Sequence, residues 1–156
     1  MGKIKMELRT GTYESAMDEK GRLGIPAKVR EWYGGELVFT MGMQPSVWIM
    51  KPEVWEKVSG KLNDSGTISV EESLSIQYQH ILPAQIGEID KSGRIAIPST
   101  LRKYAKLHHD CLVMSAENHL EIWDSDLFYE YLENNRSMYQ EAMRKLGPLK
   151  LFKVEE

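Results

Sequence analysis

The sequence is poor in several features that would assign it at once to a class of proteins. It has a single cysteine, Cys111, so no disulfide can form within one chain, as is usual in the reducing cytoplasm. It has no apolar run of about 18 residues, so no transmembrane helix is expected. Its first ten residues, MGKIKMELRT, lack the apolar core of a secretory signal. We therefore expect a cytoplasmic protein with no membrane partner.

Signatures of catalysis and of nucleotide binding are missing as well. The sequence contains no G-x-x-x-x-G-K-[ST], G-x-S-x-G or H-E-x-x-H pattern. The run HHDC at 108–111 groups metal-capable side chains, but its contiguous spacing differs from the C-x-x-C and H-x-x-x-H spacings of zinc sites. We therefore expect no enzyme, no metal and no cofactor, and no small-molecule ligand is evident.

Positive charge is limited and unevenly distributed. The 156 residues are 42% hydrophobic and 28% charged, as in a folded protein, and their formal net charge is −3. Residues 107–133 include no lysine or arginine, whereas residues 90–106 hold five cations against one acid. Such polarity is common on a solvated surface, and it can also mark a nucleic-acid contact. Charge alone leaves both interpretations open.

A nine-residue phrase occurs twice in the chain. DEKGRLGIP begins at Asp18 and DKSGRIAIP begins at Asp90, which is 72 positions later (90 − 18). The similarity continues more weakly into a later strand that contains Trp48 in one copy and Trp123 in the other. Internal similarity of this kind indicates a repeat architecture. We predict a first repeat at about 8–59, a linker helix at about 60–83, a second repeat at about 84–135, and a C-terminal helix and tail at 136–156.

Each repeat has the local pattern of two strands, a short helix and two further strands. Asp18 and Asp90 are typical of turns because aspartate accepts hydrogen bonds from amides further along its own turn. Gly21 and Gly93 suit a turn position with positive φ. The part of each repeat that resembles the other is about 40 residues long, which is too small to bury a core alone. We therefore expect residues 1–156 to form one pseudo-symmetric α+β domain, closed as a β-barrel with flanking helices, and one long helix over 124–148.

The repeated phrase resembles the AbrB-like swapped-hairpin DNA-binding fold, and its duplication resembles the MraZ family. The matching segments are DEKGR with IPAKVRE and DKSGR with IPSTLRK, and the resemblance covers about Met6 to Glu133. It implies a double-split barrel of two ββαββ repeats. It also implies a nucleoid-associated transcriptional regulator that binds double-stranded DNA at promoter direct repeats of a division and cell-wall gene cluster, as a ring-shaped homo-oligomer. Met6 is a candidate native start, and the family pattern does not clearly predict the tail beyond Glu133.

The same resemblance suggests which residues contact DNA. By position, the family's DNA-contacting arginines fall on Arg22 and Arg94, and Arg30 and Arg102 match basic positions of the wider fold. A guanidinium group suits this role because its planar fork can bind guanine O6 and N7, or a phosphate. Neighbouring lysines are candidate phosphate contacts, namely Lys20, Lys28, Lys91 and Lys103. We expect the two turn arginines to read the site, most simply for repression.

Two alternatives stay open at this level. The aspartate of each turn can pair with the arginine four residues later, and such an exposed ion pair would need no DNA partner. The fold is also shared by antitoxins that bind a protein through a tail. An antitoxin-like interaction module, with the tail 136–156 as its binding segment, is therefore the alternative function.

Overall fold

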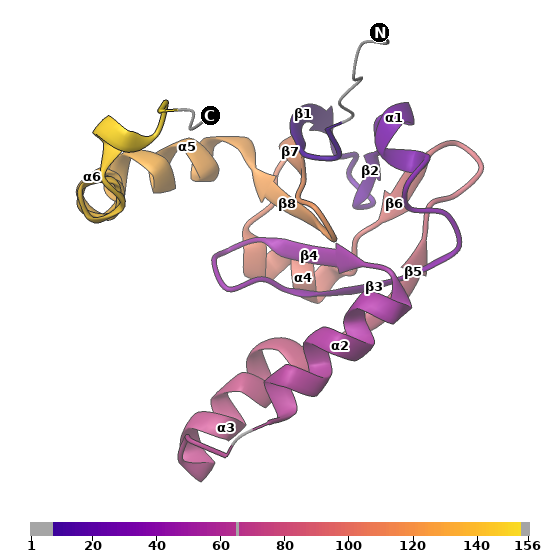
Figure 1. The fold of residues 1–156 in the computed structure, drawn as a ribbon. Coiled ribbons are helices and arrows are strands. Elements are labelled where there is room, and N and C mark those ends of the chain that lie inside the picture. Colours follow the sequence, from indigo (N-terminus) through magenta and orange to yellow (C-terminus); the bar gives the residue numbers. More distant parts are fainter. Residues whose placement is uncertain (1–7, 65, 154–156) are drawn as a thin grey trace, which may run out of the picture. The chain divides into compact units, whose positions relative to one another are not determined.

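The computed structural model describes residues 8–64 and 66–153, so the candidate start Met6 lies outside the described residues (Figure 1). The chain divides into two compact units, the first ending at Ser125 and the second beginning at Asp126. In the described part of the chain, every helix is too short or too polar to cross a membrane.

The first unit has the predicted α+β composition. In each repeat a strand pair, a short helix and a second strand pair follow one another. The elements of the first repeat and the linker are β1 (Gly11–Ala16), β2 (Arg22–Gly24), α1 (Ala27–Arg30), β3 (Glu36–Met41), β4 (Val47–Met50), α2 (Pro52–Asn63), α3 (Val70–Ile76) and the π-helix η1 (Gln77–Ile81). Those of the second repeat are β5 (Gln85–Glu88), β6 (Arg94–Ala96), α4 (Ser99–Ala105), β7 (Asp110–Ser115) and β8 (Leu120–Asp124).

The strands form one six-stranded antiparallel sheet, in the order β1-β7-β8-β4-β3-β5, and one two-stranded sheet of β2 and β6. The first strand of each repeat pairs with the third strand of the other repeat. Tyr13 of β1 faces Val113 of β7, and Gln85 of β5 faces Phe39 of β3. The strand order is therefore unchanged when the two repeats exchange places.

A closed barrel, which the resemblance implied, is not found. Strands β1 and β5 form the two edges of the large sheet, and no pairing between them joins these edges within 8–64 and 66–153. Strands β2 and β6 are only three residues long and pair with each other, with one further bridge between Met17 and Leu23. Their central residues, Leu23 and Ile95, belong to the same core cluster as residues of the large sheet.

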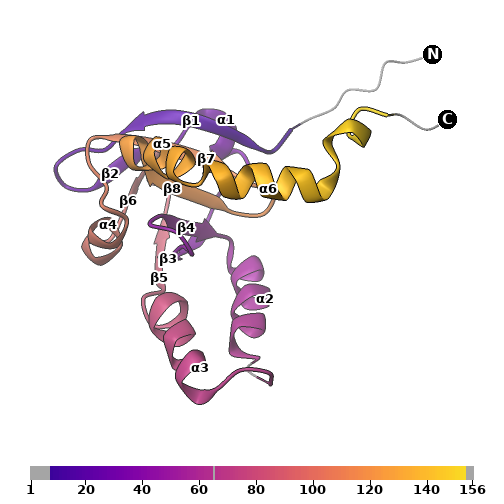
Figure 2. The ribbon, with the colours of Figure 1, turned by 90° about the vertical axis from the view of Figure 1, so that its left-hand side faces the viewer.

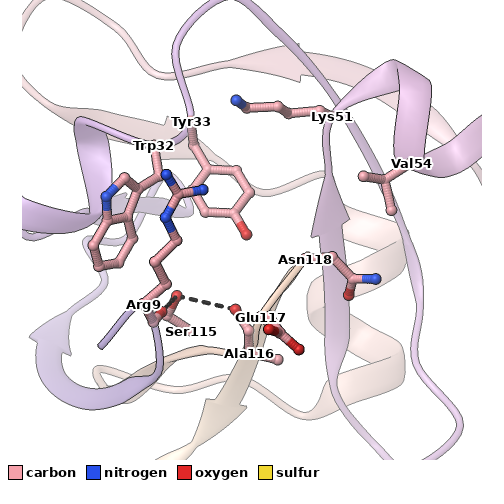
Figure 3. Close-up of a pocket in the computed structure, with 9 residues that line it drawn as sticks. All are labelled: Arg9, Trp32, Tyr33, Lys51, Val54, Ser115, Ala116, Glu117 and Asn118. Atoms are coloured by element: carbon pink, nitrogen blue, oxygen red, sulfur yellow. Dashed lines mark hydrogen bonds between the residues drawn. The ribbon is translucent and has the colours of Figure 1, made fainter. Parts of the chain in front are cut away.

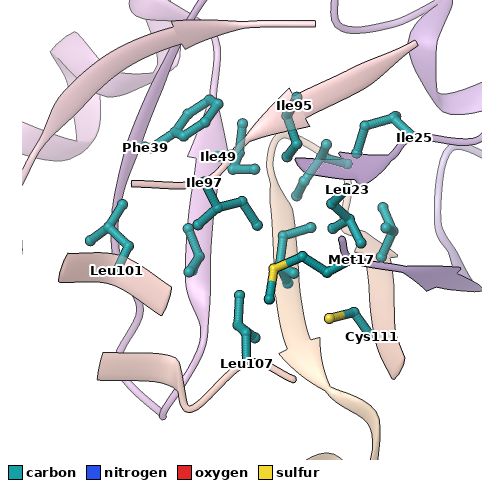
Figure 4. Close-up of a cluster of buried hydrophobic side chains, with 14 of the residues drawn as sticks. Met17, Leu23, Ile25, Phe39, Ile49, Ile95, Ile97, Leu101, Leu107 and Cys111 are labelled. Atoms are coloured by element: carbon teal, nitrogen blue, oxygen red, sulfur yellow. The ribbon is translucent and has the colours of Figure 1, made fainter. Parts of the chain in front are cut away.

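The core of the first unit is shared by the two repeats (Figure 4). Leu23 faces Ile95 across the small sheet, and Val47 faces Ile122 at the centre of the large sheet. All four side chains are buried. Burying each one stabilises the fold by about 1.5–3 kcal/mol relative to leaving it exposed. Because each pair takes one residue from each repeat, neither repeat encloses this core alone.

The helices of the two repeats differ in length. The short helix predicted in each repeat has four residues in α1 and seven in α4. The linker is helical over α3 and η1, and Ser69 and Glu72 form a capping box at its start. Helices α2 and α3 lie side by side beyond one end of the sheet in both views (Figures 1 and 2).

The second unit contains most of α5 (Ser125–Asn134), with α6 (Arg136–Leu146) and the 3-10 turn η2 (Pro148–Lys150). The prediction of one uninterrupted helix over 124–148 is wrong. Asn135 leaves the helical conformation at φ −111°, and its side-chain amide donates to the carbonyl of Tyr131 at 2.8 Å. Asparagine interrupts helices in this way because its side chain competes for backbone hydrogen bonds.

Candidate nucleic-acid interface

The first repeated phrase folds into a tight turn between β1 and β2. The Oδ1 atom of Asp18 accepts hydrogen bonds from the amides of Lys20 and Arg22, both at 2.9 Å. The amide of Gly21 donates to the Asp18 carbonyl at 3.0 Å, and this glycine has φ +82°. The carboxylate therefore organises the turn, which exposes Glu19 and Lys20.

The second phrase folds in the same way between β5 and β6. The Oδ1 atom of Asp90 accepts from the amides of Ser92 at 2.8 Å and Arg94 at 3.0 Å. The amide of Gly93 donates to the Asp90 carbonyl at 2.9 Å, with φ +78°. Two copies of one local sequence thus make two copies of one turn.

Antiparallel pairing between β2 and β6 places each turn beside the end of the other repeat's short strand. Reciprocal backbone bonds tie each strand to the other repeat's turn: the Ile25 amide donates to the Gly93 carbonyl at 2.8 Å, and the Ile97 amide donates to the Gly21 carbonyl at 2.9 Å. Figure 1 shows β2 and β6 side by side. The 72-residue separation in the sequence therefore becomes direct contact in the fold.

The turn arginines converge on one carboxylate. Arg22 Nε lies 2.7 Å from Asp18 Oδ2, and Arg94 Nη1 lies 3.5 Å from the same oxygen. The arginine side chains remain 40% and 36% exposed respectively. The ion pair within the first turn, one of the open alternatives, is thus present, whereas Arg94 reaches across to the first repeat. Sequence spacing could not reveal this cross-repeat contact.

Both turn carboxylates are held in their charged form. The pKa of Asp18 is lowered mainly because its carboxylate accepts a hydrogen bond from the backbone amide of Arg22. The side chain of Arg22 lowers this pKa further. The amide of Arg94 lowers the pKa of Asp90 in the same way. At neutral pH the two turns therefore present two arginines beside two aspartates, and their local charge is balanced.

The second arginine of each repeat packs against the other repeat's turn. A Cβ atom at Gly21 would lie 2.7 Å from Arg102 Cζ, and one at Gly93 would lie 2.8 Å from Arg30 Cζ. A side chain at either glycine would therefore have to displace an arginine, in addition to the strain of its positive φ. Arg30 is exposed, whereas Arg102 is half-buried and its Nε has no hydrogen-bond partner in the described structure. The repeated arginine was visible in the sequence, but its contact with the opposite turn was not.

The lysines predicted to contact phosphate surround this region. Lys20 and Lys91 lie in the two turns, Lys28 lies on α1 and Lys103 lies on α4. All four are exposed, and none forms a salt bridge within the part of the chain that the structure describes. The excess positive charge near the turns therefore resides on lysines rather than on the paired arginines.

Comparison with known proteins identifies close similarity over most of the chain. The family described as "MraZ protein, putative antitoxin-like" matches residues 8–75 and 81–147. A protein of Treponema denticola is 36% identical over 141 residues, which is 90% of this chain and 98% of that protein. A Symbiobacterium thermophilum protein is 36% identical over 137 residues, covering 88% and 99%, and one from Lactiplantibacillus plantarum is 32% identical over 136 residues, covering 87% and 96%.

Each of these relatives is named "Transcriptional regulator MraZ", which is a non-enzymatic role. The family match ends at residue 147, so it includes α5 and α6. The similarity therefore extends beyond Glu133, where the motif-based resemblance ended. Only the last nine residues, 148–156, follow the matched segment.

Proposed function

The chain belongs to the MraZ family, and we propose on that basis that it is a DNA-binding transcriptional regulator whose paired turns contact DNA. The observation that carries the proposal is the pairing of β2 with β6, which brings the partly exposed side chains of Arg22 and Arg94 to the same carboxylate. Two arginines at one edge suit a duplex, whose bases and phosphates recur at regular spacing.

The contact with Asp18 is compatible with this role. An exposed ion pair contributes little to stability, whereas a bidentate arginine contact to guanine O6 and N7 discriminates by about 1–3 kcal/mol. Either arginine would therefore gain free energy by leaving the carboxylate of Asp18 and binding the edge of a guanine base. In the free protein the carboxylate holds both guanidinium groups close together, which limits the conformational freedom that they lose on binding.

The surrounding cations would set affinity rather than sequence preference. Lys20, Lys28, Lys91 and Lys103 are exposed and would contact phosphates, with Arg30 and Arg102 behind the turns. The second repeat is the more basic one, because Lys103 occupies the position of Glu31 and Lys91 that of Glu19. We propose that the second turn makes the closer approach to the phosphate backbone.

A single subunit offers few cations against a net charge of −3, so strong binding requires several subunits. We propose a ring-shaped homo-oligomer that places its turns on successive promoter direct repeats. An exposed apolar stripe supports an interface between subunits: Val70, Leu74 and Tyr78 follow one another at four-residue spacing, and Ile86 is exposed on edge strand β5. Substituting Tyr78 with Glu should reduce both the oligomer size and the DNA affinity.

We further propose that the regulator acts at the nucleoid and represses a division and cell-wall gene cluster. Selection of bound DNA from random sequence, with the full-length protein, tests the proposed binding to direct repeats. Recovered sequences should contain direct repeats at a constant spacing. Recovery of unrelated sequences, or of single sites at which the oligomer gains no affinity from a second copy, would contradict it.

The arginine assignment is tested with a charge-matched pair of variants. Arg22→Ala/Arg94→Ala removes two positive charges from the turns, and Lys57→Ala/Lys61→Ala removes two from α2. We expect only the first variant to lose binding to the selected DNA, with melting temperature and oligomer size unchanged in both. Equal losses in the two variants would show that net charge, and not the turns, controls binding.

A second function is favoured by the words "antitoxin-like" in the family description. In this alternative the segment 136–156, which contains α6, would bind a protein partner. Deletion of 136–156 should then abolish capture of that partner in a pull-down while DNA binding persists. If the shortened chain captures the same proteins as the full-length chain, this alternative is wrong.

A further inference from the structure

A cavity of about 200 Å³ lies at the end of β1 opposite to the paired turns (Figure 3). Arg9, at its wall, precedes β1, whereas Asp18 follows that strand. Six strand residues span about 20 Å, so the cavity and the turns are separate sites. The proposed contact with DNA therefore does not account for this cavity.

The hydroxyl group of a largely buried tyrosine points into the cavity. Tyr33 is only 5% exposed, and its phenolic oxygen is directed toward Asn118 and the open volume (Figure 3). This hydroxyl has no hydrogen-bond partner among the residues that the structure describes. Burial raises the pKa of Tyr33, and the charge of Arg9 opposes that shift only in part. At neutral pH the group is therefore a neutral hydrogen-bond donor that faces the cavity and has no acceptor from the protein.

Two cations converge on the same volume. The Arg9 guanidinium lies 5.9 Å from the centre of the Trp32 ring, and the Arg9 carbonyl accepts a hydrogen bond from Ser115 Oγ at 2.6 Å. Lys51 approaches from the start of α2, whose N-terminus has no side-chain cap. Neither cation forms a salt bridge within residues 8–64 and 66–153. Glu117 is the one acid in the lining, so two positive charges face one negative charge.

We propose that this cavity binds a small oxyanion, namely the phosphate or carboxylate group of a free metabolite. Arg9 would supply a planar pair of donors, Lys51 a point charge, and the hydroxyl of Tyr33 and the amide of Asn118 further hydrogen bonds. The positive end of the α2 dipole adds to the attraction. The volume is below the 300–1,000 Å³ of typical drug-sized sites, so the ligand is a compact anion. The site would make the regulator responsive to a metabolite.

Isothermal titration of the full-length protein with inorganic phosphate and with citrate tests the proposal, in a chloride buffer of constant ionic strength. Saturable binding of one anion in preference to the other identifies the phosphate or the carboxylate as the ligand group. Tyr33→Phe, which removes only the hydroxyl, should weaken binding about tenfold or more, because hydrogen bonds to charged groups are strong. Arg9→Gln should weaken it similarly. Glu117→Gln should strengthen it about two- to threefold, because an opposing charge is removed.

Lys57→Met is the matched control, since Lys57 lies on α2 but does not line the cavity, and its anion affinity should equal that of the unmodified protein. Tyr33→Phe should leave binding of the selected DNA unchanged. A failure of the anion-binding proposal can therefore be distinguished from a failure of the DNA-binding proposal. No saturable binding of either anion, or unchanged affinity in both Arg9→Gln and Glu117→Gln, would overturn the inference. So would a change of oligomer size in Tyr33→Phe without anion binding, since an acidic side chain of another copy would then fill the cavity.

Discussion

Substitution of the two turn glycines by alanine should give unequal losses of stability, although the turns have the same sequence pattern. Gly21 and Gly93 have φ of +82° and +78°, and each is crossed by an arginine of the other repeat. The two arginines differ, because Arg30 is exposed whereas Arg102 is half-buried with a buried Nε. An added methyl group can displace Arg30 into solvent, but it must force Arg102 out of a packed position.

The expected magnitudes follow from this difference. Alanine in the left-handed region is disfavoured by about 1–2 kcal/mol relative to glycine. Gly93→Ala should lose about that amount, and so should Gly35→Ala, because Gly35 has φ +79° with no atom near its absent Cβ. Gly21→Ala adds an overpacking term of about 1–2 kcal/mol and should lose about 2–4 kcal/mol in total. For a chain of 156 residues, each kcal/mol corresponds to about 2–4 °C in melting temperature.

Urea unfolding followed by tryptophan fluorescence measures these losses, since all four tryptophans lie in the first unit. Arg102→Ala supplies the second arm of a double-mutant cycle with Gly21→Ala. In the Arg102→Ala background, Gly21→Ala should lose only about as much as Gly35→Ala, which leaves a coupling of about 1–2 kcal/mol. Gly34→Ala, which has neither a positive φ nor a close neighbour, serves as the neutral control.

Two results would refute the reasoning. Equal losses for Gly21→Ala and Gly93→Ala would show that φ strain alone controls both turns. A coupling near zero with Arg102→Ala would show that the arginine moves aside freely, and that its packing on the turn does not stabilise the fold.

Three further predictions concern other features of the first unit. The pKa values of Asp18 and Asp90 are lowered from 3.8 in the folded state, so both carboxylates stabilise that state at any pH above 3.8. This stabilisation is lost as the pH falls through the folded-state pKa values. Replacing both residues by Asn should therefore flatten the plot of melting temperature against pH between about pH 5 and pH 2. Burial raises the pKa of Cys111 to about 12, so iodoacetamide at about pH 8 should label this thiol only after unfolding. Thr40, fully buried, donates to the carbonyl of His80 at 2.6 Å, so Thr40→Val should lose about 1–3 kcal/mol in urea unfolding.

Much of the fold was predictable from local patterns. The repeated phrase predicted two similar units of strand, strand, helix, strand and strand, because alternating apolar residues, Asp–Gly turns and prolines report local backbone preferences. The exchange of β1 and β5 between repeats was not predictable, since strand partners depend on contacts distant in the sequence. The break at Asn135 was missed because the apolar stripe continues across it, whereas the break itself is a change in the backbone conformation of one residue.

The candidate site shows the same division. Arg22 and Arg94 were named from their recurrence beside turn glycines, and their role as DNA contacts stays a prediction. Their shared contact with Asp18 depends on the pairing of β2 with β6. A local sequence pattern cannot predict this pairing, because the two strands lie far apart in the sequence. The cavity around Tyr33 was missed altogether, because Arg9, Tyr33, Lys51 and Asn118 belong to no motif and meet only in the folded chain.

The sequence by itself determined the local chemistry of this protein: two turns opened by aspartate and closed by glycine, each followed by a strand and an arginine-bearing helix. Those features depend on interactions within a few residues, so they are the same in both copies. Only the tertiary structure decided that each turn lies against the other repeat's strand, that each turn glycine packs against the other repeat's arginine, and that Arg94 reaches Asp18. The physical reason is that neither repeat can bury its own apolar residues, so each completes its core, its sheet and its turn with the other.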